Sequence, residues 1–290
     1  MAGAPATLAL HLGALGDFVL SWPALGLLSA GPPSAALHLW GRPEWARLVL
    51  PPERVYDREA ARFAGLFCAQ PDPALDRWLA GFGRAVVFAA APPAELPAHL
   101  ERVVPQVWCL DTRPPAGRRV HASDWQVGQL RRRGLGGPAQ PPLVRLDLAI
   151  EKIGAVLAPG SGGRQKRLSP ALAATLARRL RAEGHDLTLL LGPAEDPAYG
   201  AALQEALRGV AYTLVREPPI TELARRLAGA VLYLGADSGV SHLAAALGAP
   251  SLVVFQASDP RVWGPRGPRA RVVISWEAAY VSLEPPQTRV

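Results

Sequence analysis

The residues best suited to chemistry lie in short glycine-containing turns that follow β-like runs of the chain. The first turn is GALGD at residues 13–17, where small residues let the backbone turn tightly and approach a ligand. It places Asp17 at the start of a helix, where a carboxylate can act as general base on a hydroxyl group. The alternative is that Asp17 only caps the helix and favours the positive end of its dipole. Because the turn contains GxxG and not GxGxxG, a dehydrogenase is disfavoured.

The second turn is a glycine-rich loop, APGSGGRQKRLSP, at residues 158–170. Its backbone N–H groups are suited to binding oxyanions, although the spacing is not that of a P-loop. Lys166 stands out because Lys152 is the only other lysine among 31 basic residues. A lysine kept in an arginine-rich chain indicates a need for a point charge, and a solvated loop lysine is the alternative. Ser169 and Pro170 predict an N-cap followed by proline at the first helical position.

The third turn is ADSGVSHLAAALG at residues 236–248, directly after the apolar run VLYLG. Asp237 or Ser238 would cap the following helix, and Gly239 would let a phosphate approach the unpaired N–H groups at its N-terminus. A diphosphate would fit such a site. His242 lies one turn into the helix, where direct chemistry and bracing of the loop by a buried side chain are both open.

The fourth turn, QASDPRVWGPRG at residues 256–267, follows the apolar run SLVVF. Asp259, Arg261 and Trp263 are candidates to line a nucleotide pocket there. The alternative is an ordered proline- and glycine-containing loop with a packed tryptophan.

An alternation of strands and helices positions these turns. Continuous apolar runs such as LTLLL and SLVVF predict strands buried on both faces, and therefore parallel sheets. Strand–helix alternation with short links predicts an α/β fold with two doubly wound domains, whose ligands bind at the carboxyl ends of the strands in a cleft between the domains. The segment GLGGPAQPP at 134–142 marks the boundary, giving domains at 1–140 and 141–290. We expect strands at 7–12, 35–40, 85–89, 106–109, 154–157, 187–191, 211–214, 231–234 and 251–255, and helices at 18–28, 59–67, 94–103, 123–133, 170–183, 196–207, 221–228 and 239–247.

The composition narrows the class of partner. A formal charge of +7 fits an anionic partner, such as nucleic acid, a phosphorylated lipid head group or a nucleotide. Nucleic acid is disfavoured because the arginines are scattered and no stacking aromatic motif is interleaved with them. Cys68 and Cys109 form no CxxC pair and have no histidine cluster nearby, which predicts reduced thiols and no metal site.

The sequence also predicts a cytoplasmic location. There is no stretch of about 20 uninterrupted apolar residues that could span a membrane. A secretory leader is not expected, because no positive segment precedes the first apolar run and Asp17 interrupts it. A peripheral contact with the inner membrane surface stays open.

The four motifs resemble those of the heptosyltransferase family of glycosyltransferases, family 9. The resemblance rests on GALGDFVLSWPAL, LAPGSGGRQKRLSP, LLGPAEDP and GADSGVSHLAAALGAPSLVVFQASDPRVWGP, in the family's order and spacing, and it runs from about Leu8 to Gly267. It implies a GT-B fold of two Rossmann-like domains that face a cleft. The first domain would take the acceptor and the second the donor. It also implies an inverting, metal-independent sugar transfer without a cofactor, from a nucleotide sugar, with ADP-heptose the typical donor, to a lipopolysaccharide or other anionic glycan or glycolipid.

The resemblance also assigns roles to residues. It implies that Asp17 is the general base and that Lys166 meets the donor phosphates. Glu195 would hold hydroxyl groups of the donor, and Asp237 would lie at the donor sugar. The remaining candidates on the donor side are Ser161, Ser238, Gly239, Val240 and His242, and those on the acceptor side are Gly16, Arg58 and Arg62.

Two other functions stay open at this stage. One is a different GT-B enzyme of sugar nucleotides, such as a 2-epimerase-like hydrolase, which product analysis would reveal. The other is a non-catalytic sugar-nucleotide-binding protein, against which the presence of both Asp17 and Lys166 argues.

Overall fold

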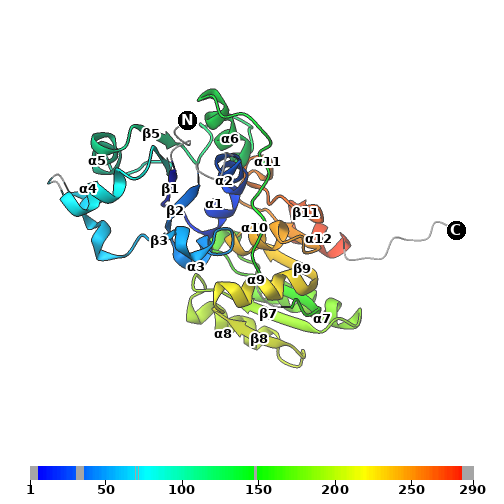
Figure 1. The fold of residues 1–290 in the computed structure, drawn as a ribbon. Coiled ribbons are helices and arrows are strands. Elements are labelled where there is room, and N and C mark those ends of the chain that lie inside the picture. The colour runs from blue at the N-terminus through cyan, green and yellow to red at the C-terminus, as the bar shows by residue number, and fades with distance from the viewer. Residues whose placement is uncertain (1–5, 31–35, 69, 71, 147–148, 283–290) are drawn as a thin grey trace. The chain divides into compact units, whose positions relative to one another are not determined.

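The chain forms two compact α/β units in a computed structural model, which describes residues 6–30, 36–68, 70, 72–146 and 149–282 (Figure 1). The first unit comprises residues 1–145 and the second residues 146–290. The predicted boundary at 140/141 lies a few residues earlier, within the segment that connects α6 (Ala122–Arg132) to β6 (Ile153–Ala158).

The first unit is built on a parallel five-stranded sheet in the order β3-β2-β1-β4-β5. The strands are β1 (Thr7–His11), β2 (Leu37–Gly41), β3 (Val55–Asp57), β4 (Arg84–Phe88) and β5 (Gln106–Leu110). The chain moves from β1 outward through β2 and β3, and then returns to the other side of β1 for β4 and β5. The order therefore reverses between β1 and β4, and the GALGD turn after β1 lies at this switch point, where open α/β sheets bind their ligands.

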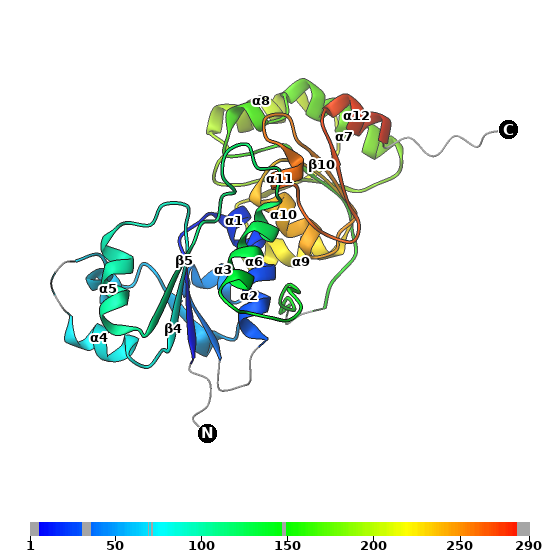
Figure 2. The ribbon, with the colours of Figure 1, turned by 90° about the horizontal axis from the view of Figure 1, so that it is seen from above.

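Helices cover both faces of this first sheet, with α4 and α5 on one face and α2 and α6 on the other (Figure 2). Leu8 and Leu10 of β1 point into the core under α5, where they pack with Trp40 and Phe63. Successive residues of a strand alternate between faces, so His11 belongs to the α2 side with Ala9. The helical segments are α1 (Leu15–Leu20), α2 (Trp22–Ser29), α3 (Pro43–Ala46), the 3-10 segments η2 (Pro52–Arg54) and η3 (Ala61–Phe67), α4 (Pro73–Leu79), α5 (Glu95–Val103) and α6 (Ala122–Arg132).

The second unit has a parallel six-stranded sheet in the order β11-β10-β9-β6-β7-β8. The strands are β6 (Ile153–Ala158), β7 (Leu187–Leu191), β8 (Thr213–Arg216), β9 (Ala230–Ala236), β10 (Ser251–Val254) and β11 (Ala270–Val273). Here the order reverses between β6 and β9. The glycine-rich loop after β6 and the DSG turn after β9 are therefore neighbours at the carboxyl edge of the sheet.

The faces of this second sheet are covered by α7, α8 and α12 on one side and by α9 and α10 on the other (Figure 2). Leu176 and Leu180 of α7 pack in one core with Leu189 of β7 and Trp276 of α12. The helical segments are η4 (Arg164–Lys166), α7 (Pro170–Ala182), α8 (Pro197–Ala206), α9 (Ile220–Gly229), α10 (Gly239–Ala246), α11 (Pro260–Trp263) and α12 (Trp276–Ser282).

The expected elements are present, with differences at short or irregular segments. The helix expected at 18–28 is two helices, because α1 ends at Leu20 and Pro23 occupies the first turn of α2. The helix expected at 59–67 is the 3-10 segment η3, and the strand expected at 211–214 is β8 (Thr213–Arg216). Among the described residues, no helix is long and apolar enough to cross a membrane.

Candidate functional site

Lys166 and Asp237 form an ion pair at the switch point of the second sheet. Lys166 ends the short 3-10 turn η4 in the loop after β6, and Asp237 directly follows β9. The Lys166 ammonium lies 2.7 Å from Asp237 Oδ2, and the side chains are 29% and 7% exposed. The same oxygen accepts a hydrogen bond from the hydroxyl of Ser258 in the loop after β10. Three loops of the sheet edge thus meet on one carboxylate.

Ser161 joins the same two loops through the backbone. Its hydroxyl is buried and donates to the carbonyl oxygen of Asp237 at 2.7 Å. The expected donor-side residues Ser161 and Lys166 therefore both contact Asp237, which lies 76 and 71 residues further along the chain (237 − 161 and 237 − 166).

Glu195 approaches this loop from the side of β7. Its carboxylate accepts a hydrogen bond from the N–H of Gly192, the residue that follows β7. The other oxygen lies so close to Gly160 that a Cβ atom on Gly160 would stand 1.8 Å from Glu195 Oε1. Burial raises the pKa of the Glu195 carboxyl, while the Gly192 N–H and the charge of Arg167 oppose that shift. Glycine at 160 therefore makes room for an acid that is almost completely buried.

The first turn of α10 is held by a chain of hydroxyl groups. Ser238 is the N-cap and accepts from the N–H of Ser241 at 3.4 Å, as expected for this position. The Ser241 hydroxyl donates to the carbonyl of Ala236 at 2.5 Å and lies 2.8 Å from the hydroxyl of the buried Tyr233. Gly235 leaves space for that tyrosine, since a Cβ there would lie 2.3 Å from its oxygen.

These hydrogen bonds of Ser238, Ser241 and Tyr233 hold the N-terminus of α10 in place. Gly239 and Val240 are the first two residues of α10, where backbone N–H groups have no intrahelical partner. His242 is buried one turn further on. Gly239 and Val240 are partly exposed, and a helix start of this kind beside the Lys166–Asp237 pair is suited to an anionic group such as a phosphate.

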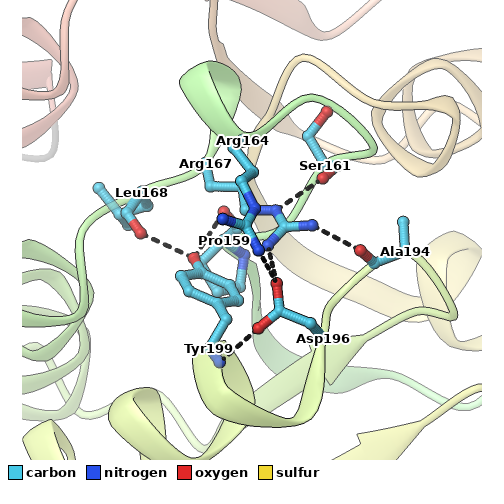
Figure 3. A network of polar contacts seen from close by, with 8 residues as sticks. All are labelled: Pro159, Ser161, Arg164, Arg167, Leu168, Ala194, Asp196 and Tyr199. Atoms are coloured by element: carbon cyan, nitrogen blue, oxygen red, sulfur yellow. Dashed lines mark hydrogen bonds and ion pairs between the residues drawn. The ribbon is translucent and has the colours of Figure 1, made fainter.

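A further set of residues around this loop was missed at the level of sequence. Arg167 lies next to Lys166 and bonds to Asp196, the N-cap of α8. The hydroxyl of Tyr199, in α8, lies within hydrogen-bond distance of the carbonyls of Pro159 and Leu168, at the two ends of the loop (Figure 3). An arginine among so many others carried no signal, and its partners Ala194 and Asp196 lie 27 and 29 residues away in the chain, after the neighbouring strand. Ser258 was missed for the same reason.

In the first unit, Asp17 is the third residue of α1. One carboxylate oxygen accepts the N–H of Ala14 at 3.1 Å, so the side chain does hold the start of the helix. The residue is nevertheless partly exposed. Gly13 must lack a side chain here, because its Cβ would lie 2.6 Å from Cβ of Asp17. Gly16 precedes Asp17 in the same turn.

His11 supports this turn from the core. Its Nε2 lies 3.3 Å from the hydroxyl of Ser21, which donates to the carbonyl of Asp17 at 2.8 Å. The ring packs edge-on against Phe18. Burial, aided by the charge of Arg58 and opposed by the Asp17 backbone, lowers the pKa of His11 from 6.5 to about 4.

This shift predicts an acid-sensitive fold. Below about pH 6.5 the unfolded chain protonates His11, whereas the folded chain does so only near pH 4. Falling pH through that window therefore favours unfolding, by as much as about 3 kcal/mol at about 1.4 kcal/mol per pKa unit. We expect His11→Gln to flatten the decline of unfolding free energy between pH 7 and 4.5 in urea titrations. His185→Gln is the control, and an equal decline in wild type and His11→Gln would contradict this assignment.

The two arginines expected on the acceptor side lie in different surroundings. Arg58 follows β3, and its Nη1 donates to the carbonyl of Leu12 at 3.3 Å. Arg58 therefore contacts the residue that directly precedes the GALGD turn. Arg62 lies instead over the rings of Phe63 and Tyr56, with its guanidinium carbon 4.6 and 5.6 Å from their centroids. Its described contacts are thus with an aromatic cluster, and nothing in them links it to Asp17.

Two doubly wound parallel sheets, each with a polar turn at its switch point, place the chain in the class of α/β proteins that bind ligands at the carboxyl ends of their strands. Among the described residues, no group of three or more His, Cys, Asp or Glu side chains is placed to hold a metal ion.

Comparison with known proteins identifies the family. The sequence model of glycosyltransferase family 9 (heptosyltransferase) matches residues 140–287, or 148 of the 290 residues. Lipopolysaccharide heptosyltransferase 3 of Escherichia coli is 33% identical over an alignment of 95 residues that covers 30% of this chain and 26% of that protein. The chain belongs to glycosyltransferase family 9, as its motifs predicted.

Solved structures agree at the level of the fold. A family 9 glycosyltransferase from Veillonella parvula superimposes with a TM-score of 0.73 at 15% identity, covering 97% of this chain and 89% of that one. The E. coli heptosyltransferase WaaC with ADP gives a TM-score of 0.71 at 18% identity, covering 96% of this chain and 98% of that one. The predicted fold class, two parallel α/β domains of the GT-B type, is confirmed.

Proposed function

We propose that this chain is an inverting, metal-independent glycosyltransferase that moves a heptose-like sugar from an ADP-linked donor to an anionic glycan or glycolipid of the lipopolysaccharide type. The observation that carries the proposal is the ion pair of Lys166 and Asp237 beside the start of α10. It places a cation, a carboxylate and unpaired N–H groups at one switch point. That combination suits a sugar joined to a diphosphate.

The donor would use all three groups at once. Its diphosphate would take N–H groups of Gly239 and Val240 together with the Lys166 ammonium. The Asp237 carboxylate would accept from hydroxyls of the sugar, and Glu195 from hydroxyls of the ribose. With Ser161 and Ser258 already bonded to Asp237, little reorganisation is required when the donor arrives.

The chemistry follows from where charge develops. The glycosidic carbon becomes oxocarbenium-like as the bond to the diphosphate breaks, and negative charge builds on the departing phosphate. Lys166 and the α10 N-terminus would stabilise that charge without a metal ion. Asp17 would remove the proton of the acceptor hydroxyl while the hydroxyl oxygen attacks the anomeric carbon. The attack comes from the face opposite the departing diphosphate and so inverts the anomeric configuration.

The direct test is transfer. We would incubate the protein with ADP-heptose and a lipopolysaccharide core acceptor that lacks the heptose, with EDTA present, and follow both ADP release and the mass of the acceptor. We expect an acceptor one heptose heavier with inverted anomeric configuration. ADP-heptose consumed without any gain in acceptor mass would favour hydrolysis or epimerisation, and binding without consumption would favour a non-catalytic binder.

The tight fit of Gly160 against Glu195 gives a test of the donor site. In Gly160→Ala the new methyl group would displace the Glu195 carboxylate, because its Cβ would stand 1.8 Å from Oε1. We expect the dissociation constant for ADP, measured by calorimetry, to rise at least tenfold, or about 1.4 kcal/mol. Gly162→Ala in the same loop meets nothing within 4 Å and should bind ADP as the wild type does. Equal affinities in the two variants would remove Glu195 from the donor site.

A further inference from the structure

The loop that carries Ser161 and Lys166 is closed at its base. The N–H of Leu168 donates to the carbonyl of Pro159 at 2.9 Å, so the two ends of the loop meet. The hydroxyl of Tyr199, from α8, lies 2.7 Å from the carbonyl of Leu168 and 3.1 Å from that of Pro159. Tyr199 thereby fastens the base of the loop to the neighbouring helix.

Arg167 fastens the interior of the same loop. Its Nε donates to the carbonyl of Ser161 at 2.9 Å, and its Nη1 to Asp196 Oδ2 at 2.8 Å. Its Nη2 donates to the carbonyl of Ala194 at 2.5 Å, and the guanidinium lies 5.2 Å from the centroid of the Tyr199 ring. Figure 3 shows the guanidinium enclosed by these partners, and the side chain is only 10% exposed.

These contacts connect two parts of the proposed donor site. Ser161 and Lys166 belong to the loop after β6, whereas Ala194 and Asp196 flank Glu195 in the turn after β7. One side chain therefore fixes the phosphate end of the site relative to the ribose end. A lysine could not do so in the same way, because its three donors share one nitrogen, whereas the three acceptors of Arg167 are reached by three different nitrogens of the planar guanidinium.

We propose that Arg167, Asp196 and Tyr199 are positioning residues, the Arg167 clamp, which hold Lys166 and Glu195 at the separation that a nucleoside diphosphate spans. The inference rests on the proposed function of this site. The clamp acts through the protein, since each of the three guanidinium nitrogens of Arg167 donates to a protein oxygen and the side chain is only 10% exposed. Its effect should appear only with ligands that reach both ends of the site.

The experiment compares two ligands on matched variants of the full chain. ADP spans both ends, whereas inorganic pyrophosphate reaches only the Lys166 end. In Arg167→Lys we expect the dissociation constant for ADP and the donor KM to rise on the order of tenfold to a hundredfold, as for a displacement of about 1 Å in a reacting site. Pyrophosphate affinity should be unchanged. An equal loss of both ligands would make Arg167 a direct phosphate ligand and overturn the proposal.

Arg164→Ala is the matched control for charge. Arg164 stands in the same loop and lies 3.5 Å from the same Asp196 oxygen, but its side chain is 85% exposed. Its removal takes away one positive charge without opening the loop, so ADP affinity should stay at the wild-type value. A loss as large as that of Arg167→Lys would mean that charge alone, and not position, accounts for the effect.

Two milder variants guard against a folding defect. Tyr199→Phe keeps the ring under Arg167 and loses only the hydroxyl at the base of the loop. Asp196→Asn keeps an oxygen that can cap α8 while removing the charge that Arg167 meets. Both should weaken ADP more than pyrophosphate, and wild-type affinities in both would overturn the proposal.

Amide hydrogen exchange of the free protein separates this inference from the proposed function. Loss of the clamp should speed exchange at residues 160–168 whether or not any ligand binds. If wild type fails to bind ADP while exchange in Arg167→Lys is faster, the proposed function fails and the clamp stands as a structural feature. If wild type binds ADP and Arg167→Lys binds it equally well, the positioning role is overturned and the proposed function stands.

Discussion

Replacing Lys166 by alanine is expected to abolish the thermal stabilisation that ADP confers and to lower kcat/KM about a hundredfold to a thousandfold. That is the range found when one preorganised donor to a developing anion is removed. A ligand that binds only the folded state at a hundredfold excess over its dissociation constant adds about 2.7 kcal/mol of stability. Differential scanning fluorimetry with ADP and with UDP, followed by initial-rate measurements, would test this and would identify the base of the nucleotide.

The chain supplies its own control for this experiment. Lys152 is the only other lysine, and it is exposed just before β6, so Lys152→Ala removes the same charge and should respond to ADP as the wild type does. In the absence of ligand, Lys166→Ala should also unfold more readily, by about 1.5–3 kcal/mol, because the buried Asp237 carboxylate loses a charged hydrogen-bond donor. An ADP response in Lys166→Ala equal to that of the wild type would exclude Lys166 from the donor site.

Long apolar strands and capped helices could be predicted from the sequence because each carries its signal locally. LTLLL is β7 over Leu187–Leu191, the range expected. Ser169 caps α7, and Pro170 begins it, as that pair predicted. Such segments need no knowledge of the rest of the chain, since periodicity and capping act within a few residues.

The missed elements are short or depend on tertiary contacts. β3 has three residues and β11 has four. Neither strand is the continuous apolar run that marks the similarly short β10, since Asp57 ends β3 and Arg271 lies within β11. They form because a neighbouring parallel strand supplies the hydrogen bonds. The sequence did offer two unused signals, since Asp72–Pro73 and Asp259–Pro260 are each an N-cap followed by proline at the first position, and α4 and α11 begin there.

The candidate site likewise contains residues that a local pattern marked and residues that no local pattern marked. Lys166 and Asp237 stood out because an unusual residue type or a glycine turn marked them, but their 2.7 Å contact depends on β6 and β9 being adjacent in the sheet. Strand order is set by which crossovers the whole domain can pack, and no local pattern encodes it. Ser258 and Arg167 were invisible for that reason. They are common residue types whose meaning comes only from neighbours on other strands.

Asp17→Asn is expected to lower kcat by about a hundredfold to ten-thousandfold, the range associated with loss of a general base. The substitution separates the two roles considered for Asp17, which are general base and helix cap. Its oxygen can still accept the N–H of Ala14, which the carboxylate meets at 3.1 Å, so the start of α1 should stay intact. It cannot take a proton from an acceptor hydroxyl. Turnover would be measured with saturating ADP-heptose and acceptor.

The controls decide between the base and the cap. ADP binding should be unchanged in Asp17→Asn, because Lys166, Asp237 and the start of α10 belong to the second unit, and the melting temperature should match that of the wild type. Asp17→Ala should lose turnover equally and also lose stability, since nothing accepts the Ala14 N–H in its place. If Asp17→Asn turns over normally while Asp17→Ala does not, the carboxylate is a helix cap and the base lies elsewhere. If both are inactive and only the alanine variant is destabilised, proton transfer and helix capping are two separate functions of one carboxylate.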